Sequence, residues 1–269
     1  MASPMPSQWH NFLQNLGAWR GSFSGIRPDG TPLNDTPSLL TLEPGETDAE
    51  GAITMVRFGL KRFSGPGPDA TPVSEISQEY RSLGRQVVFF DTGSFCKGSL
   101  QVAPGTVFGG EFGFIHGDRR HRLVLLYTEA GSPDQLVLIR EFRAGSNAVE
   151  QPPLEHSQLL GTWRGQAATI SADWPEPDHA EASLTVQTGP DGDAQLTTTI
   201  AGVTAAFEGR MQWLPDAGYH LSPLQVSHRS PFAVQAGWLP EPDRLECLIR
   251  RFDGTGAWQA STQLRLQRV

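Results

Sequence analysis

The sequence predicts an all-β protein made of two tandem antiparallel barrels, each led by a short helix. The first observation is a repeated phrase: residues 16–21 read Leu-Gly-Ala-Trp-Arg-Gly, and residues 160–165 read Leu-Gly-Thr-Trp-Arg-Gly. The second is composition, because 29 Gly and 21 Pro are spread through 269 residues, as expected where turns join many short strands. We therefore predict two domains, at residues 1–147 and 154–269.

A short helix is predicted ahead of each barrel. Ser7 suits an N-cap, and Trp9, Phe12 and Leu16 fall on one face of a helix that Gly17 can end. We expect this helix to cover one end of the first barrel. Residues 154–160 can form two helical turns at the same place before the second copy of the phrase.

Strand-like runs follow each copy of the phrase. The run 53–63 puts Val56, Phe58 and Leu60 on one face and Met55, Arg57 and Lys61 on the other. The remaining runs share short length and flanking turn residues. They are 19–23, 38–43, 73–83, 86–90, 95–102, 106–115, 123–128 and 136–142, then 182–188, 196–200, 205–213, 219–226, 232–239, 245–252 and 256–269.

Charged residues in and near these runs need interpretation. Residues 118–122, Asp-Arg-Arg-His-Arg, form the one concentrated basic patch, which we interpret as a solvated loop. In the run 136–142, Arg140 shares a face with Leu136, Leu138 and Phe142. A buried arginine there needs a partner.

Composition excludes several classes of protein. The net charge of −8 and the lack of a broad basic face argue against nucleic-acid binding. Residues 1–7 have no signal-peptide features, and no run of 18 apolar residues occurs, so we expect no membrane insertion and a cytoplasmic location. Only Cys96 and Cys247 are present, which favours a reducing compartment; a single disulfide bond between the two domains is the alternative. No nucleophile elbow, P-loop or dinucleotide fingerprint occurs, and the seven His show no metal-ligand spacing.

Gly-x-Trp on a first strand with an arginine on a late strand resembles the lipocalin or calycin signature. In those barrels the arginine lies across the tryptophan at the closed end, which implies the pairs Trp19–Arg140 and Trp163–Arg250. Residues 138–142, Leu-Ile-Arg-Glu-Phe, and 248–252, Leu-Ile-Arg-Arg-Phe, support this as a second repeated phrase. A guanidinium on an indole contributes about 1–2 kcal/mol when desolvated.

Several segments match a known family: they are residues 9–17, 35–38, 88–90, 117–120, 159–163 and 173–174 and the two Leu-Ile-Arg segments. Through these segments the whole chain resembles an uncharacterised family of cyanobacterial and plastid proteins with two lipocalin-like barrels. The resemblance implies a fold and a photosynthetic lineage, and the family has no established reaction. It also implies a distant relation in fold to single-barrel phycobiliprotein lyases. The opening of the second domain is similar to that of nitrobindin-type haem barrels, so haem on His220 or His228 is an alternative.

Cations lie among aromatic residues in the first domain and suggest a ligand. They suit an elongated apolar molecule that carries carboxylates, such as a bilin, another tetrapyrrole or a fatty acid. No cofactor is required for this role. The alternative is that these charges face outward over a filled core. The candidate residues are Arg57, Lys61, Tyr80, Arg81, Arg85, Phe89, Phe112 and Tyr127.

Non-enzymatic binding or chaperoning of a small hydrophobic carboxylate is the function that the sequence favours. The enzymatic alternative is a bilin lyase or isomerase that acts on phycobiliproteins, with Cys96 beside Lys97 as a transient acceptor. An inert, half-buried thiol is the simpler interpretation of Cys96. A third alternative is a scaffold or assembly factor whose barrels are filled.

Overall fold

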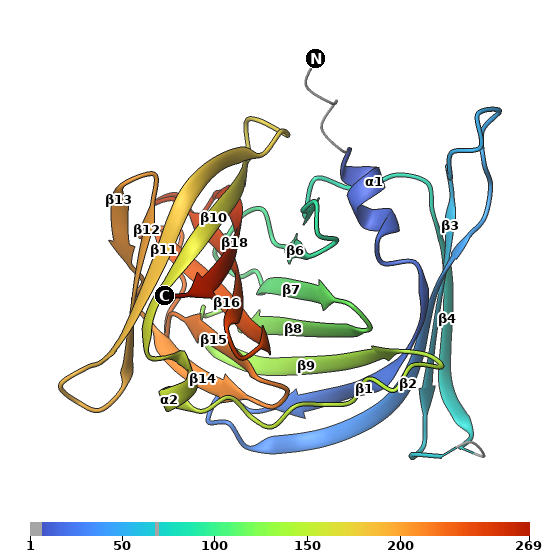
Figure 1. Ribbon diagram of the computed structural model, residues 1–269, viewed down its shortest axis with the longest axis horizontal. Helices are drawn as coiled ribbons and strands as arrows, with labels where there is room; N and C mark the ends of the chain where they lie inside the picture. The colour runs from blue at the N-terminus through green and yellow to red at the C-terminus, as the bar shows by residue number, and fades with distance from the viewer. Residues whose placement is uncertain (1–6, 68–69) are drawn as a thin grey trace.

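Two curled antiparallel sheets lie side by side in the computed structural model, which describes residues 7–67 and 70–269 (Figure 1). The prediction of an all-β protein with two tandem barrel-like sheets is confirmed. Each sheet has nine strands, and no hydrogen bonds within the described ranges join its two edge strands. Residues 1–6, which belong to the segment assessed for a signal peptide, lie outside the described part.

The sheet of β1–β9 is called the N-terminal half-barrel. Its strand order is β4-β3-β2-β1-β9-β8-β7-β6-β5. The elements are α1 Gln8–Leu13, β1 Gly17–Ile26, β2 Pro32–Pro44, β3 Val56–Phe63, β4 Pro72–Tyr80, β5 Val87–Phe89, β6 Phe95–Gly98, β7 Phe108–His116, β8 Arg119–Tyr127 and β9 Pro133–Arg143.

The sheet of β10–β18 is called the C-terminal half-barrel. Its order, β13-β12-β11-β10-β18-β17-β16-β15-β14, repeats that of the first sheet position by position. The predicted strand 205–213 is in fact two strands, β13 and β14. The elements are α2 His156–Leu159, β10 Gly161–Ser171, β11 Asp178–Thr188, β12 Ala194–Ile200, β13 Val203–Ala206, β14 Arg210–Leu214, β15 Gly218–Ser222, β16 Phe232–Glu241, β17 Arg244–Phe252 and β18 Trp258–Arg268.

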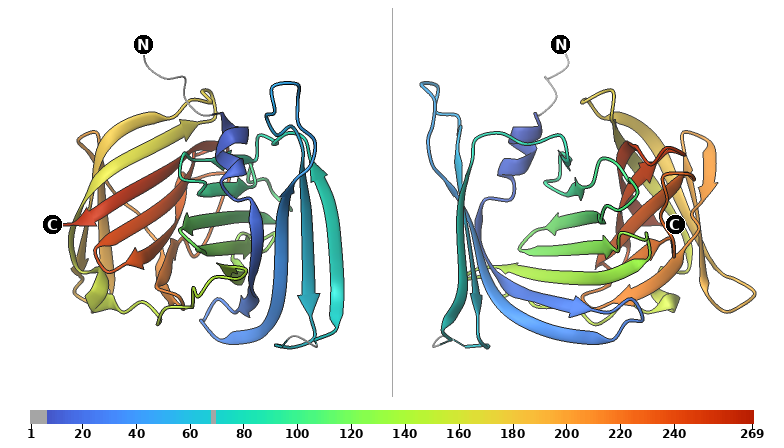
Figure 2. Two further views of the ribbon diagram at one scale, coloured as in Figure 1. Left: turned by 45° about the vertical axis from the view of Figure 1, so that its right-hand side comes forward. Right: turned by 180° about the vertical axis from the view of Figure 1, so that it is seen from behind.

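The helix α1 lies over one end of the N-terminal half-barrel (Figure 2). It begins as predicted, since the Ser7 side chain accepts a hydrogen bond from the backbone N–H of His10. The Gln8 side chain donates to Phe89 O at 2.9 Å and accepts from Phe89 N at 2.7 Å. Trp9 Nε1 donates to Ile53 O at 2.6 Å. The helix thus links β5 to the segment before β3, across the open side of the sheet.

The predicted pairing of Trp19 with Arg140 and of Trp163 with Arg250 is wrong. The guanidinium carbon of Arg143 lies 4.3 Å from the ring centre of Trp19, and that of Arg268 lies 4.1 Å from Trp163. Trp19 stands opposite Arg143 in the register of β1 and β9, whereas Arg140 stands opposite Ser22. Residues three apart on a strand point to opposite faces, so Arg140 cannot reach the indole.

The second repeated phrase does not mark equivalent positions in the two half-barrels. Residues 138–142 lie on β9, whose counterpart by sheet order is β18, whereas residues 248–252 lie on β17, the counterpart of β8. Arg250 therefore lies between the half-barrels, where its Nη2 donates to Ser99 O at 3.0 Å.

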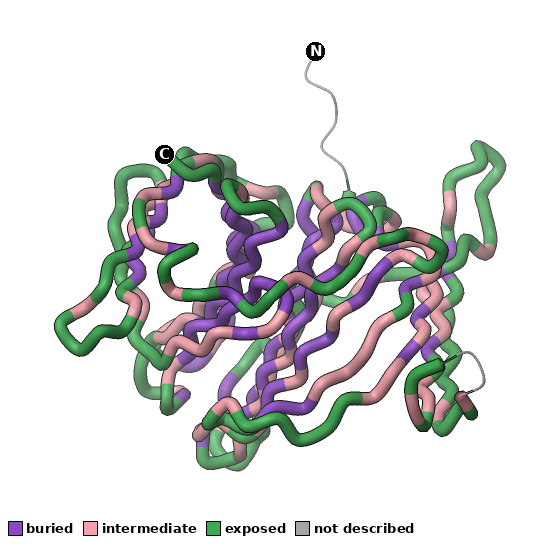
Figure 3. Tube along the Cα trace, turned by 60° about the horizontal axis from the view of Figure 1, so that its bottom comes forward, coloured by how far each residue is buried: buried purple, intermediate pink, exposed green. Residues whose placement is uncertain are grey.

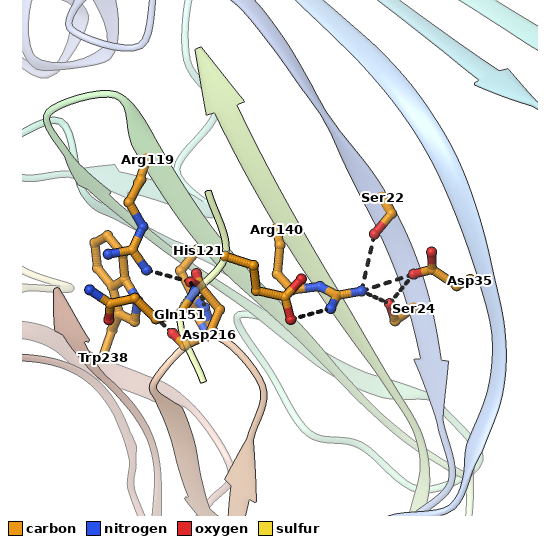
Figure 4. Close-up of polar contacts among 10 residues, drawn as sticks. Ser22, Ser24, Asp35, Arg119, His121, Arg140, Gln151, Asp216 and Trp238 are labelled. Carbon is orange, nitrogen blue, oxygen red and sulfur yellow. Dashed lines mark hydrogen bonds and ion pairs between the residues drawn. The ribbon is translucent and has the colours of Figure 1, made fainter. Parts of the chain in front are cut away.

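Arg140 has the partners that its position requires, on the outer face of β9. Its guanidinium donates to Ser22 Oγ and Asp35 Oδ1, and to Glu150 Oε1 at 2.7 Å (Figure 4). Glu150 belongs to the segment between the half-barrels, so Arg140 holds that segment against the first sheet.

An apolar core joins the half-barrels through the outer faces of their central strands, where buried residues concentrate (Figure 3). Phe108 packs on Phe232 with ring centres 5.5 Å apart, and Phe114 packs on Trp238 at 6.1 Å. By strand register, Phe108 in the first half-barrel is the counterpart of Phe232 in the second, and Phe114 is the counterpart of Trp238. The two copies therefore meet as subunits do across a two-fold axis.

A buried polar cluster lies beside this core. Asp216 Oδ1 accepts from Arg119 and from the backbone N–H of Gln151, and Asp216 Oδ2 lies 3.3 Å from His121 Nδ1 (Figure 4). Trp238 Nε1 donates to Asp216 O at 2.9 Å. Burial alone would raise the pKa of Asp216, but its bonds to His121 and Gln151 and the charge of Arg119 lower it. Asp216 thus connects β8, the linking segment and the second half-barrel.

Within residues 7–67 and 70–269, neither the length nor the hydropathy of any helix would let it cross a bilayer.

Arg143→Met is expected to lower the free energy of unfolding by about 1–2 kcal/mol, because it removes the cation from the Trp19 face. Chemical denaturation of the purified protein checks this value. Arg57→Met, at an exposed position on β3, is the control and is expected to change stability by less than about 0.5 kcal/mol. Equal stability of the two variants would contradict the stacking.

Asp216→Asn is expected to destabilise the protein by about 3 kcal/mol at neutral pH, because Arg119 loses a buried counter-charge. The lowered pKa of Asp216 means that its stabilisation is complete above about pH 4 and lost as pH falls through the folded-state value. The stability gap between wild type and variant should therefore narrow below about pH 4. Denaturation curves across pH measure this gap, and a constant gap would contradict the assignment.

Candidate binding site

The inner face of the N-terminal half-barrel encloses a cavity of about 330 Å³. This volume lies at the lower end of the range of small-molecule sites. Exposed Ser82, Gly84 and Gln86, from the segment between β4 and β5, mark its rim. The walls are mainly apolar and come from α1 and from all nine strands of this sheet. Prominent among them are Phe12, Phe23, Leu40, Phe58, Leu60 and Phe89.

Charged side chains gather on one wall of this cavity. Arg120 and Arg122 point inward from β8, with Glu111 on β7 and Glu141 on β9. Arg120 Nε and Arg122 Nε lie 3.5 and 3.4 Å from the same oxygen, Glu141 Oε2. Arg122 Nη1 lies 3.5 Å from Glu111 Oε1. These ion pairs are long, and none has hydrogen-bond geometry.

The two guanidinium groups are held by aromatic rings and keep donors free. Arg120 lies 5.0 Å from the ring centre of Trp19, and Arg122 lies 5.9 Å from that of Phe23. Arg120 is only 3 % exposed, and its Nη1 has no hydrogen-bond partner among the described residues; the same holds for Arg122 Nε. Burial lowers the pKa of Arg120 to about 10, and Glu141 opposes this, so the group stays cationic at neutral pH. The wall can therefore donate several charge-assisted hydrogen bonds to an anion.

The interpretation of residues 118–122 as a solvated loop is wrong. Arg120, His121 and Arg122 are buried on β8. Alternation sends Arg120 and Arg122 into the cavity and His121 into the contact between the half-barrels. Both faces of β8 are thus covered, which is why a basic segment can be buried here.

The C-terminal half-barrel shows what these positions hold in the second copy. By strand register, Arg120, Arg122 and Glu141 correspond to Leu245, Cys247 and Leu266. Lys97 and Glu111 likewise correspond to Leu221 and Gln235. All these counterparts are buried, and the leucines and the cysteine belong to one apolar cluster with Trp163 and Tyr219. Charge on the inner wall is therefore specific to the N-terminal copy.

Two of the eight candidate ligand residues, Tyr80 and Phe89, line the cavity. Burial raises the pKa of Tyr80, so its phenol stays neutral. Phe112 and Tyr127 belong to the core between the half-barrels instead.

The four cations among these candidates are exposed and lie outside the cavity. Arg57 and Lys61 are on the outer face of β3, and Lys61 pairs with Glu75 at 3.3 Å. Arg81 pairs with Glu46 at 2.5 Å. Arg85 donates to Ala172 O at 3.2 Å.

The structure does not favour Cys96 as a bilin acceptor or His220 as a haem ligand, whereas haem on His228 stays a prediction. Cys96 is buried in the core between the half-barrels, and burial raises its pKa to about 12, so it is not half-buried and is poorly suited to accept a bilin. Both ring nitrogens of His220 lie within hydrogen-bond distance of side chains, Gln212 and Ser222. Burial lowers the pKa of His220 to about 4. A ring held at both nitrogens offers none to a haem iron.

Sequence reasoning missed Arg120, Arg122, Glu111 and Glu141. A usable signal was present on β8, where Leu123, Leu125 and Tyr127 share one face while Arg120, Arg122 and Val124 share the other. Recognising it required knowing that both faces of this strand are covered, which depends on the second domain.

These features define a protein of two joined half-barrels with an internal cavity in the first. The family model described as domain of unknown function DUF3598, N-terminal, matches residues 5–146. The chain belongs to this family. The model described as biogenesis factor required for ATP synthase 1, C-terminal domain, matches residues 150–269.

One solved structure agrees along the whole chain. It is a DUF3598-family protein of unknown function from Nostoc punctiforme PCC 73102, 38 % identical, with a TM-score of 0.87 over 98 % of this chain and 100 % of that one. An S-type phycobiliprotein lyase from Guillardia theta is 10 % identical, with a TM-score of 0.19 over 98 % of this chain and 93 % of that one. An overlap this weak carries no argument. No curated protein matches the chain.

Proposed function

We propose that this protein binds or chaperones a small hydrophobic carboxylate in the N-terminal half-barrel. One observation carries the proposal: an apolar cavity has two buried guanidinium groups on its wall, and among the described residues Arg120 Nη1 and Arg122 Nε have no hydrogen-bond partner. A carboxylate head group satisfies such donors, and the aromatic and aliphatic walls suit an apolar body. Fatty acids and bilins belong to this ligand class.

The second half-barrel supports the proposal by contrast. It has the same strand order, yet its inner wall carries Leu245, Cys247 and Leu266 where the first has Arg120, Arg122 and Glu141. Stability alone does not require charge at these positions, because buried ion pairs stabilise little compared with well-packed apolar groups. Ligand recognition accounts for their presence in the first copy.

The triple variant Arg120→Leu, Arg122→Cys and Glu141→Leu, which copies the second wall onto the first, tests this function. Calorimetric titration of full-length protein with dodecanoate and with biliverdin should show saturable binding of at least one, weakened at least about tenfold in the variant. Its stability should be similar to that of wild type, because Glu141 leaves together with both arginines that approach it.

The matched control is Arg57→Leu with Lys61→Leu, on the exposed outer face of β3. This pair should leave affinity unchanged, because neither side chain lines the cavity. Wild-type protein that takes up neither ligand would contradict the proposal, as would equal affinity in the triple variant.

A second candidate function is participation in the assembly of ATP synthase. It is supported by the match of residues 150–269 to the ATP synthase biogenesis factor model, and a filled C-terminal half-barrel suits a docking domain. Bilin lyase or isomerase activity remains a prediction from the sequence.

Removal of the gene from its host should lower the amount of assembled ATP synthase while its subunits are still synthesised, if the second candidate holds. Native gels with subunit-specific detection measure both quantities. Complementation with the triple cavity variant then shows whether assembly needs the cavity. Normal assembly in the deletion strain would contradict this function.

A further inference from the structure

We propose that the cavity selects a head group with a single negative charge, and so a monocarboxylate with one apolar chain. The proposal rests on the proposed function and narrows its ligand class. The charged groups on or against the cavity wall are Lys97, Arg120 and Arg122, opposed by Glu111 and Glu141. These five groups carry a net charge of +1 by count.

The geometry shows where this excess positive charge lies. Arg120 and Arg122 both approach Glu141 Oε2, and Arg122 Nη1 lies 3.5 Å from Glu111 Oε1, so the two arginines and the two glutamates balance in charge. Lys97, opposite Glu111 in the register of β6 and β7, supplies the remaining positive charge. The wall as a whole therefore leaves one positive charge for a ligand, and among the described residues Arg120 Nη1 and Arg122 Nε have no hydrogen-bond partner.

Other cations nearby do not change this count. Arg143 pairs with Asp118 at 2.8 Å. Arg62 lies 4.6 Å from the ring centre of Phe23 and is not among the residues that line the cavity.

A single anionic charge is therefore the best match to this wall. A neutral head group leaves the net positive charge of the wall uncompensated, and a doubly charged one leaves an excess of negative charge. Uncompensated buried charge is costly in either direction. The wall should discriminate among ligands by head-group charge even when their apolar chains are identical.

Cavity size favours one chain over a ring system. A volume of about 330 Å³ lies near the lower limit for small-molecule sites. A single alkyl chain fits such a space, whereas a linear tetrapyrrole is larger and carries two propionates. The structure thus favours a fatty-acid-like ligand within the wider class.

Three ligands with the same alkyl chain test the charge rule: decanoate, decan-1-ol and decylmalonate, whose heads carry one, no and two negative charges. Each is titrated calorimetrically into full-length wild-type protein at about pH 8, where both malonate carboxyls are ionised. Decanoate should bind at least about tenfold more tightly than either of the others. Decylmalonate or decanol binding as tightly as decanoate would overturn the rule.

Glu111→Gln raises the net charge of the wall by one and should change the preference. Decylmalonate should gain at least about tenfold relative to decanoate in this variant. The matched control is Glu75→Gln, at an exposed position on β4, which should keep the wild-type order. Circular dichroism checks that the variants fold. If Glu111→Gln does not fold, the titrations of the wild-type protein still test the charge rule.

The outcomes separate this inference from the proposed function. Absence of saturable binding for all three ligands, with dodecanoate and biliverdin also inactive, rejects the proposed function itself. Equal binding of the three, lost in the triple cavity variant, keeps the function and rejects the charge rule.

Discussion

The packing of two apolar outer faces against each other is the constraint on which the rest of the structure depends. The central strands of both sheets present aromatic and aliphatic side chains outward, and each sheet hides them only against its copy. Phe108 against Phe232 and Phe114 against Trp238 show that equivalent positions meet. Since this contact occupies the outer faces, the inner faces are where the two copies are free to differ.

The interiors of the two half-barrels differ. The second sheet fills its interior, where Tyr219 lies within hydrogen-bond distance of Cys247 and Gln235. The first keeps a cavity and a wall on which aromatic rings hold arginine side chains over Glu141. Both retain the indole covered by guanidinium, at Trp19 with Arg143 and at Trp163 with Arg268. That closure belongs to the architecture, and the charged wall belongs to the site.

Much of the fold could be predicted from the sequence, and less of the site. The repeated phrase at residues 16–21 and 160–165 begins β1 and β10, and the alternation on β3 was predicted correctly. The choice of Arg140 over Arg143 failed because a pattern of residue types does not reveal strand register. Arg120 and Arg122 were missed because burial of β8 on both sides depends on a domain more than a hundred residues away.

The two faces of strand β8 have different surroundings. Odd-numbered His121, Leu123 and Leu125 belong to the contact with the other half of the chain, while even-numbered Arg120, Arg122 and Val124 face the enclosed space. Substitutions at the even-numbered positions leave the contact between the half-barrels intact. The lining of the cavity can therefore differ among relatives that share the fold. Under the proposed function, a homologue with the same outline and different even-numbered residues on this strand is expected to bind a different ligand.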